Sequence, residues 1–357
     1  MADTRSGLVS TIIPVRNRPR LVREAVESVL RQEYRPIEVI VCDDESTDDT
    51  ADAAEALVRH NPGLVRLLRL THRGQGQVRE AGRLVAGGEY IQYLDSDDVL
   101  RPRKFAVQVQ ALRRSPECGV AYGCVALWRS GDPPADRPHK WTGRALPTLF
   151  PWLLVDRWWT THAPLYRRSL CDGIGPWSDL KRSEDWEYDA RIGALGTKLV
   201  HCSEFVGDQR RHEGEPHLTD ATDWNSLERV RDRKRFFGMM LEHAFAAGMT
   251  PEMPEMQHFS RRVFHGARDC AAAGLEDEAR DCLEWARKAA GPERSRSADF
   301  RIWDLMVRVL GARAAGRVAA GADRLRRRPG PATLKESWMP GAAPRVPVSG
   351  SDRGMEP

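Results

Sequence analysis

The feature that most restricts the fold is a regular alternation of short apolar runs with helix-like segments in the first third of the chain. The runs are rich in β-branched residues and end at turn residues, which is typical of buried strands. In the segments between them, apolar residues recur three and four positions apart, which predicts amphipathic helices. The predicted strands are residues 8–13, 37–44, 64–70 and 88–94, and the predicted helices are residues 19–32, 46–60, 77–86 and 102–114. This order predicts an α/β fold, a parallel sheet with helices on both faces.

The remainder of the chain has a looser pattern that ends in helices. Residues 181–196 read as a helix that Ser183 opens, and residues 227–290 are helical, with a hairpin bent at Gly274. Residues 301–328 carry eight arginines against two aspartates, so we expect a basic amphipathic helix there. We predict three parts: an α/β domain at 1–220, a helical region at 221–328 and a disordered tail at 329–357.

Composition excludes several classes of protein. The net charge of +4 is too small to indicate a nucleic-acid binder by itself. The seven cysteines include no CxxC pair, which favours a reducing compartment over a disulfide framework. No stretch of about 18 apolar residues exists, and the first residues lack the pattern of a signal peptide. We therefore expect a soluble, cytoplasmic protein.

Acidic residues follow two of the predicted strands. Asp43 and Asp44 end the second strand, and Asp95 and Asp97 follow the fourth in "YIQYLDSDDVLRP". Ligands of open parallel sheets bind beyond the carboxyl ends of the strands, so both groups should lie at one edge. Clustered carboxylates repel one another unless a cation joins them, and oxygen ligands suit Mg²⁺ or Mn²⁺ with substrate phosphates. The alternative is an aspartate-rich turn that caps helix 102–114. We interpret Asp98 as a cap of this helix and not as a ligand.

Two common nucleotide-binding loops are missing after the first strand. The segment "PVRNRP" is neither GxGxxG nor GxxxxGK[ST], so dinucleotide and P-loop interpretations lose their main support.

Four segments instead resemble the family 2 glycosyltransferases of the GT-A fold, in the order that this family has them. They are "VSTIIPVRNRPRLVREAVESVLRQEY", "IEVIVCDDESTDDT", "GQGQVREAGRLVAGGEYIQYLDSDDVLRP" and "SEDWEYDARIGALG". The third ends in the family's Asp-x-Asp motif and the fourth carries its Glu-Asp-Trp. The resemblance spans roughly the first 215 residues. It implies a Rossmann-like, mostly parallel sheet followed by a helical C-terminal region.

The resemblance also implies which residues bind the nucleotide. Asp44 would accept a hydrogen bond from the imino group of uracil or a similar base, and the backbone of Pro14, Val15 and Arg16 would frame that base. Arg79 would lie near the nucleotide. Arg16 occupies the position at which the family normally has an aromatic residue, and a guanidinium can also stack on a base. A surface ion pair is the alternative role for Arg79.

The remaining implied roles concern the metal and the reaction. Asp95 would touch the ribose or the metal, Ser96 would line the same site, and Asp97 would bind the metal directly. Asp185, the second residue of Glu-Asp-Trp, would be the general base. His212 stands where some members place an extra metal ligand, although an exposed loop histidine is the alternative.

Each of three further features allows two interpretations. The tryptophans of residues 151–169 could line an acceptor groove or fill the core. His162 could contact the diphosphate or the acceptor, or be a buried structural histidine. Residues 301–328 could be a solvated helix face or a contact with an anionic membrane.

The resemblance thus implies an inverting glycosyltransferase that uses a nucleotide-diphosphate sugar, with UDP as the expected nucleotide, and a divalent metal, Mn²⁺ or Mg²⁺. Its acceptor, a glycan, lipid-linked sugar, protein or small metabolite, has no motif that names it, and no nucleic acid is expected as a partner. One alternative is a nucleotidyltransferase that makes sugar nucleotides, and another is a non-catalytic binding protein on a transferase-like domain.

Overall fold

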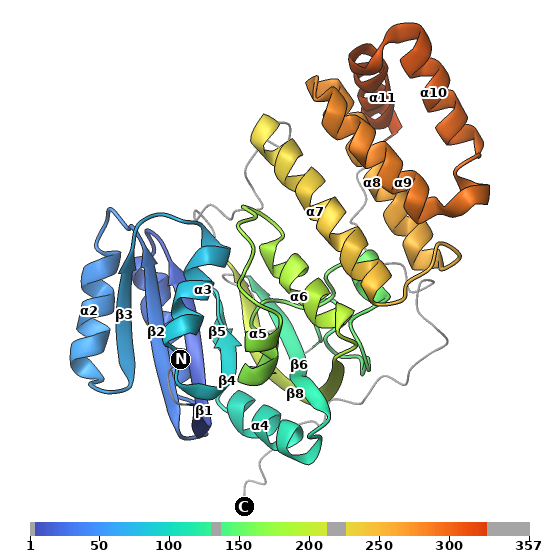
Figure 1. Cartoon of the computed structure of the whole chain (residues 1–357). Coiled ribbons are helices and arrows are strands. Elements are labelled where there is room, and N and C mark those ends of the chain that lie inside the picture. Colours follow the sequence, from blue (N-terminus) through green and yellow to red (C-terminus); the bar gives the residue numbers. More distant parts are fainter. Residues whose placement is uncertain (1–3, 130–136, 213–225, 327–357) are drawn as a thin grey trace, which may run out of the picture.

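The computed structural model describes residues 4–129, 137–212 and 226–326. Within these residues eight strands form one sheet, in the order β3-β2-β1-β4-β7-β6-β8-β5 (Figure 1). The strands are β1 (Arg5–Val15), β2 (Ile37–Asp44), β3 (Val65–Leu70), β4 (Gly88–Tyr93), β5 (Val99–Leu100), β6 (Cys118–Arg129), β7 (Pro164–Arg167) and β8 (Lys198–Arg211). The four strands predicted from the sequence are all present, and β2 has the predicted bounds.

The direction of the strands decides where their carboxyl ends lie. β1 pairs in parallel with β2 and β4, β2 with β3, and β6 with β8. β7 runs antiparallel to β4 and to β6, and β5 runs antiparallel to β8. Because β7 is reversed relative to both neighbours, β6 and β8 point the same way as β1, β2 and β4. The carboxyl end of β8 therefore lies at the same edge as those of β1, β2 and β4.

Helices cover both faces of the sheet (Figure 1). The helices next to the sheet are α1 (Pro19–Leu30), α2 (Thr50–His60), α3 (Gln75–Val85), α4 (Lys104–Arg114), α5 (Arg168–Gly173), α6 (Glu184–Ala194) and the 3₁₀ turn η1 (Trp152–Leu154). Alternate residues of β1 face opposite sides, as a strand requires. Ile13 packs in a core with α1, α2 and α4, and Ile12 packs in a second core with α3, α5 and α6. The predicted mostly parallel sheet with helices on both faces is confirmed.

A helical region follows the sheet, as predicted. Its members are α7 (Leu227–Ala246), α8 (Pro254–Ala273), α9 (Glu276–Arg294), α10 (Ala298–Leu310) and α11 (Ala312–Arg326). The predicted bend at Gly274 separates α8 from α9, and the φ of +82° there suits glycine. The single helix predicted for 301–328 is wrong: Gly311, with a φ of +77°, divides α10 from α11.

This helical region shares a core with the sheet domain. One continuous set of buried apolar side chains extends from Ile12 in β1 to Ala319 in α11. The Trp186 ring on α6 contacts the Phe236 ring on α7, with 5.4 Å between centroids, and the Arg262 guanidinium of α8 lies 4.8 Å from the Trp186 centroid. The helices thus support α6 directly.

Two helix starts differ from the sequence prediction. The second helix begins at Thr50, not at Ser46, whose hydroxyl instead accepts a hydrogen bond from the Asn17 amide. Ser183 does precede α6, but in a left-handed conformation and without a side-chain capping bond. The predicted domain boundary at 220 and the predicted tail at 329–357 lie outside the described residues. Among the helices described, none has the length and apolar character needed to cross a membrane.

Candidate active site

The residues singled out in the sequence gather at one edge of the sheet. Asp44 ends β2, the segment from Asp95 to Asp97 follows β4, and His212 directly follows β8. Since these strands point the same way, their carboxyl ends share an edge. The Nε2 atom of His212 lies 3.3 Å from the carbonyl oxygen of Asp97, although the two residues are 115 positions apart.

Arg79 of α3 joins two carboxylates in this site. Its Nη2 donates to Asp95 Oδ1 at 2.6 Å, and its Nη1 donates to Glu184 Oε1 at 2.7 Å. The Arg79 side chain is only 1% exposed, so the surface ion pair considered for it is wrong. Burial alone would lower the pKa of Arg79, but the carboxylates of Asp95, Glu184 and Asp185 raise it above its ordinary value. The guanidinium therefore stays charged and fixes α6 next to the Asp-x-Asp segment.

The two carboxylates that Arg79 joins respond differently to burial. Burial favours the neutral form of both, yet Arg79 holds the pKa of Asp95 below its ordinary value. For Glu184, burial together with the neighbouring charge of Asp185 outweighs Arg79 and raises the pKa to about 7. Asp95 is therefore the more firmly ionised of the two.

Asp97 presents a partly exposed carboxylate at the opening of the site. Arg18 Nη1 donates to Asp97 Oδ2 at 2.7 Å, and Arg210 Nε donates to the Asp97 carbonyl at 2.7 Å. Two guanidinium groups, those of Arg18 and Arg79, therefore face the carboxylates of Asp97 and Asp95.

Asp98 has a structural role that differs from the predicted helix cap. Helix α4 begins only at Lys104, and Asp98 Oδ1 instead accepts from the Arg210 amide at 2.9 Å. Asp98 Oδ2 lies 2.9 Å from Nδ1 of His162, whose side chain is fully buried. Burial raises the pKa of Asp98 to about 6. His162 is thus a buried structural histidine, and the structure does not favour a contact with the diphosphate or the acceptor.

Asp185, the predicted base, lies in the first turn of α6. Its Oδ1 accepts from the Trp186 amide at 2.7 Å, and its Oδ2 accepts from Arg157 Nη1 at 2.6 Å. Arg157 also donates through Nε to Asp189 Oδ2 at 2.7 Å, and Trp159 Nε1 donates to the same oxygen at 2.7 Å. Asp189 is fully buried, whereas 27% of the Asp185 side chain is exposed. The carboxylate of Asp185 is therefore held in place and remains partly exposed.

Asp44 orders the loop that follows β3. Its Oδ2 lies 2.7 Å from His72 Nδ1, and its Oδ1 accepts from the Arg73 amide at 2.8 Å. Nε2 of His72 lies 3.1 Å from Nη1 of Arg16, which is exposed beside it. His72 thus links Arg16 to Asp44 through its two ring nitrogens.

The other predicted nucleotide-binding residues lie in the same part of the sheet. Pro14 and Val15 end β1 between β2 and β4, where Val15 is opposite Asp43. Ser96 is buried between the two aspartates of the motif.

The tryptophans of residues 151–169 belong to the core. Trp158 and Trp159 are completely buried, and Trp152 is nearly so. The structure therefore favours core packing over an acceptor groove for these tryptophans.

The residue types at this edge suit a hard divalent cation, although the protein supplies few ligands. In the part of the chain that the structure describes, no three or more His, Cys, Asp or Glu side chains gather closely enough to hold a metal ion. Asp95 and Asp97 are neighbours, and His212 Nε2 approaches the backbone carbonyl oxygen of Asp97. Mg²⁺ commonly takes one or two protein carboxylates and completes its shell with water and substrate phosphates, which this arrangement permits.

Sequence reasoning missed the cationic partners of the acidic residues. Arg18 could have been noticed beside Arg16 in the loop after β1, because an arginine there faces the same edge. His72 and Arg157 lie in segments without a motif, and nothing in the sequence indicates that they reach Asp44 and Asp185.

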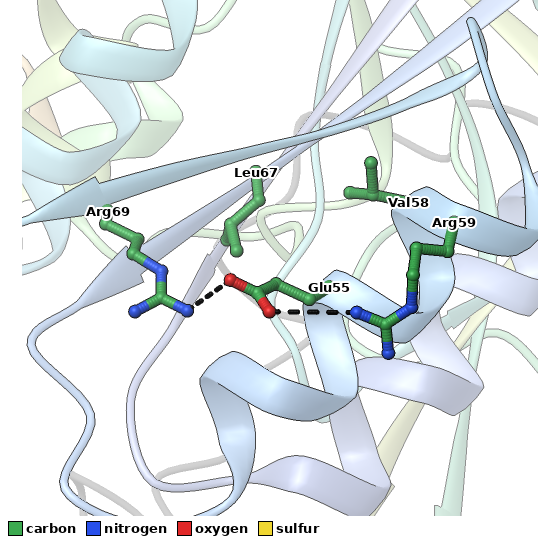
Figure 2. A pocket seen from close by; sticks show the side chains of 5 residues that line it. All are labelled: Glu55, Val58, Arg59, Leu67 and Arg69. Atoms are coloured by element: carbon green, nitrogen blue, oxygen red, sulfur yellow. Dashed lines mark hydrogen bonds and ion pairs between the residues drawn. The ribbon is translucent and has the colours of Figure 1, made fainter.

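A separate hollow of about 360 Å³ lies between α2 and β3. Figure 2 shows Glu55 between Arg59 and Arg69, with Leu67 and Val58 beside them. Both arginines pair with Glu55 on an exposed edge of the molecule. None of the predicted site residues lines this hollow, so it is a surface ion-pair cluster.

Comparison with known proteins agrees with this geometry. The model of the family described as glycosyl transferase family 2 matches residues 10–172, which extend from within β1 through β7 and include the Asp-x-Asp segment. This part of the chain is similar to glycosyl transferase family 2. An uncharacterized glycosyltransferase of Nostoc sp. is 34% identical over 203 residues, 56% of this chain and 60% of that protein.

Two further relatives extend the comparison of the family 2 domain. The Escherichia coli UDP-Glc:α-D-GlcNAc-diphosphoundecaprenol β-1,3-glucosyltransferase WfaP is 36% identical over 29% of this chain and 40% of its own length. The chain thus spans less than two thirds of either curated relative. The structure of S. aureus TarS 1–349 in complex with UDP-GlcNAc matches with a TM-score of 0.60 and 19% identity, over 90% of this chain and 93% of that one. This likeness confirms the predicted GT-A fold, including the helices after the sheet.

The family model that matches is one of glycosyl transferases, whereas the alternatives from the sequence were a nucleotidyltransferase and a non-catalytic binding protein. The Asp-x-Asp and Glu-Asp-Trp segments of the chain, which the sequence separates by about 90 residues, meet at Arg79.

Proposed function

We propose that the protein is an inverting glycosyltransferase that moves a sugar from a UDP-sugar to an acceptor hydroxyl. The observation that carries this proposal is the bridge through Arg79, which joins Asp95 on the donor side to Glu184, the neighbour of Asp185. The segment proposed to bind the diphosphate and the proposed base are therefore neighbours. The match of residues 10–172 to the model of glycosyl transferase family 2 supports the same activity.

The nucleotide would lie over the carboxyl ends of β1 and β2. We propose that the uracil ring lies against the backbone of Pro14, Val15 and Arg16, and that Asp44 contacts it together with His72. The exposed Arg16 guanidinium lies beside His72 and could stack on the ring. The binding of UDP-GlcNAc by TarS, a protein of the same fold, supports a uridine donor.

The diphosphate would lie at the Asp-x-Asp segment. Asp95 and Asp97 would hold a divalent cation, Mn²⁺ or Mg²⁺, with His212 as a further ligand and Ser96 lining the site. When bound, such a cation supplies positive charge that stabilises the departing diphosphate. Arg18 and Arg79 place two more positive charges beside the same carboxylates.

Asp185 would take the proton of the acceptor. In a single displacement the acceptor oxygen forms a bond to the anomeric carbon as the bond from that carbon to the diphosphate oxygen breaks, and UDP leaves with the bonding electrons. The acceptor proton passes to the carboxylate of Asp185. Arg157 fixes the orientation of this carboxylate through a charge-assisted hydrogen bond.

The acceptor and the extent of the catalytic part are also proposals. WfaP is named for transfer to a diphosphoundecaprenol-linked sugar. By analogy we propose a lipid-linked saccharide as the acceptor, with residues 1–220 as the catalytic domain and residues 221–328 as its helical support.

The donor proposal predicts a metal-dependent thermal shift. Because few protein ligands gather at the site, we expect Mn²⁺ alone to change the melting temperature little. Mn²⁺ together with UDP or the true UDP-sugar, each at about 100 times its Kd, should raise the melting temperature by about 5 °C. CDP and ADP should raise it less, because neither cytosine nor adenine has the imino N–H from which Asp44 would accept a hydrogen bond.

Asp97→Ala should abolish the part of this shift that requires Mn²⁺. Asp277→Ala, which removes a carboxylate from an exposed position on α9, is the matched control and should keep the full shift. A shift that is equal with and without Mn²⁺, or that survives in Asp97→Ala, would contradict the assignment of the metal to this segment.

A further inference from the structure

Helix α10 has apolar side chains on two opposite faces. Phe300 and Trp303 are buried against the rest of the helical region. On the other side Ile302, Leu305 and Val309 are 57%, 59% and 69% exposed. Their spacing of three and four residues places them in one stripe along the helix. We call these three residues the α10 stripe.

Exposed leucines and valines are common one at a time, but a continuous stripe is not. Leu310 at the end of α10 and Val318 on α11 are also about half exposed, so exposed apolar side chains occur on both sides of the break at Gly311. Figure 1 shows α10 and α11 at the end of the molecule that lies farthest from β3. The stripe is therefore not part of the site described above.

Arginines border this apolar surface. Arg301 and Arg308 on α10 and Arg313 and Arg317 on α11 are all exposed. Asp304 is the only acidic residue between 301 and 322, and both of its carboxylate oxygens accept from Arg287. The surface thus combines aliphatic side chains with positive charge that no carboxylate in this segment balances.

We propose that the α10 stripe and its arginines dock on an anionic lipid surface. Interfacial helices insert aliphatic side chains to the depth of the headgroups while basic residues at their border contact the anionic lipids. A second copy of the chain fits less well, because a symmetric contact would bring the same four arginines against one another. Nucleic acid fits poorly, since the exposed stripe offers no aromatic ring for base stacking.

This docking is separate from the proposed sugar transfer and can be tested without it. The full-length chain is sedimented with phosphatidylcholine vesicles that contain or lack phosphatidylglycerol, at low and at high salt. We expect binding only to the vesicles with phosphatidylglycerol, and less binding at high salt. The triple variant Ile302→Ser, Leu305→Ser, Val309→Ser should lower the partition coefficient by about tenfold or more.

A charge variant and a matched control complete the test. Arg301→Ser with Arg308→Ser should lower binding about 25-fold, since each arginine near an anionic surface contributes about fivefold. Leu84→Ser with Leu195→Ser removes two equally exposed leucines from the sheet domain and should leave binding unchanged. The donor-dependent thermal shift should be normal in all of these variants.

Several results would overturn the proposal. One is failure of the wild-type chain to sediment with anionic vesicles at low salt, and another is equal binding by the serine triple variant. A third is a wild-type chain that is dimeric in solution and does not bind vesicles, together with a triple variant that is monomeric. That result would show that the α10 stripe contacts a second copy of the chain instead.

Discussion

Asp185→Asn is expected to lower turnover by about 10²–10⁴-fold and to leave donor binding intact. Asparagine has the shape of aspartate but cannot accept the acceptor proton. Its amide can still accept from the Trp186 amide, and Arg157 keeps its bond to Asp189, so the first turn of α6 should persist. The loss should therefore appear in kcat and not in the affinity for the donor.

The measurement is the release of UDP from the UDP-sugar that gives the largest thermal shift, with and without a lipid-linked saccharide. Calorimetry with the same donor gives its Kd for each variant. Asp179→Asn is a suitable control, because this carboxylate lies on the exposed loop before α6 and pairs with Arg235. Near-normal turnover in Asp185→Asn would show that another group takes the proton.

Arg79→Met should be the most destabilising single change in the site. Removing one partner of a buried ion pair leaves an unpaired buried charge, at a cost of about 3–5 kcal/mol in the free energy of unfolding. In this case two carboxylates, those of Asp95 and Glu184, lose the same guanidinium. Methionine keeps most of the aliphatic volume, so lost packing contributes little.

Chemical denaturation of the wild type and the variants measures this cost. Arg59→Met is the matched control, because Arg59 pairs with Glu55 at an exposed position and should change stability by less than about 1 kcal/mol. The double variant Arg79→Met, Glu184→Gln should recover part of the loss, since it removes one of the two unpaired charges. A cost below about 1 kcal/mol for Arg79→Met would mean that the bridge is not important for the fold.

The sequence predicted the sheet well because its strands carry local signals. β2 was recognised over its full length, since a run of apolar residues ends in Asp43 and Asp44 at the point where the strand leaves the sheet. The edge at which Asp44, Asp95 and Asp97 gather follows from parallel pairing alone. Family resemblance added Asp185, which lies about 90 residues further along the chain.

The contacts that make these residues a site were beyond sequence reasoning because they join distant segments. Arg157 comes from a segment without periodicity, and it reaches Asp185 only because η1 and α6 pack together. Asp98 looked like a helix cap because it precedes α4, yet its partners come from β8 and from His162. The break at Gly311 was missed because residues on both sides of it favour a helix.

The packing of Trp186 on α7 and α8 has a consequence for how such enzymes can be altered. The residue after the proposed base is anchored by Phe236 and Arg262, so the position of the base depends on helices that carry none of the chemistry. Substitutions at that junction should displace the Asp185 carboxylate slightly and so slow turnover, although the substituted residues contact no substrate. A hybrid protein that combines the sheet of one enzyme with the C-terminal helices of another would have to preserve the contacts of Trp186 with Phe236 and Arg262.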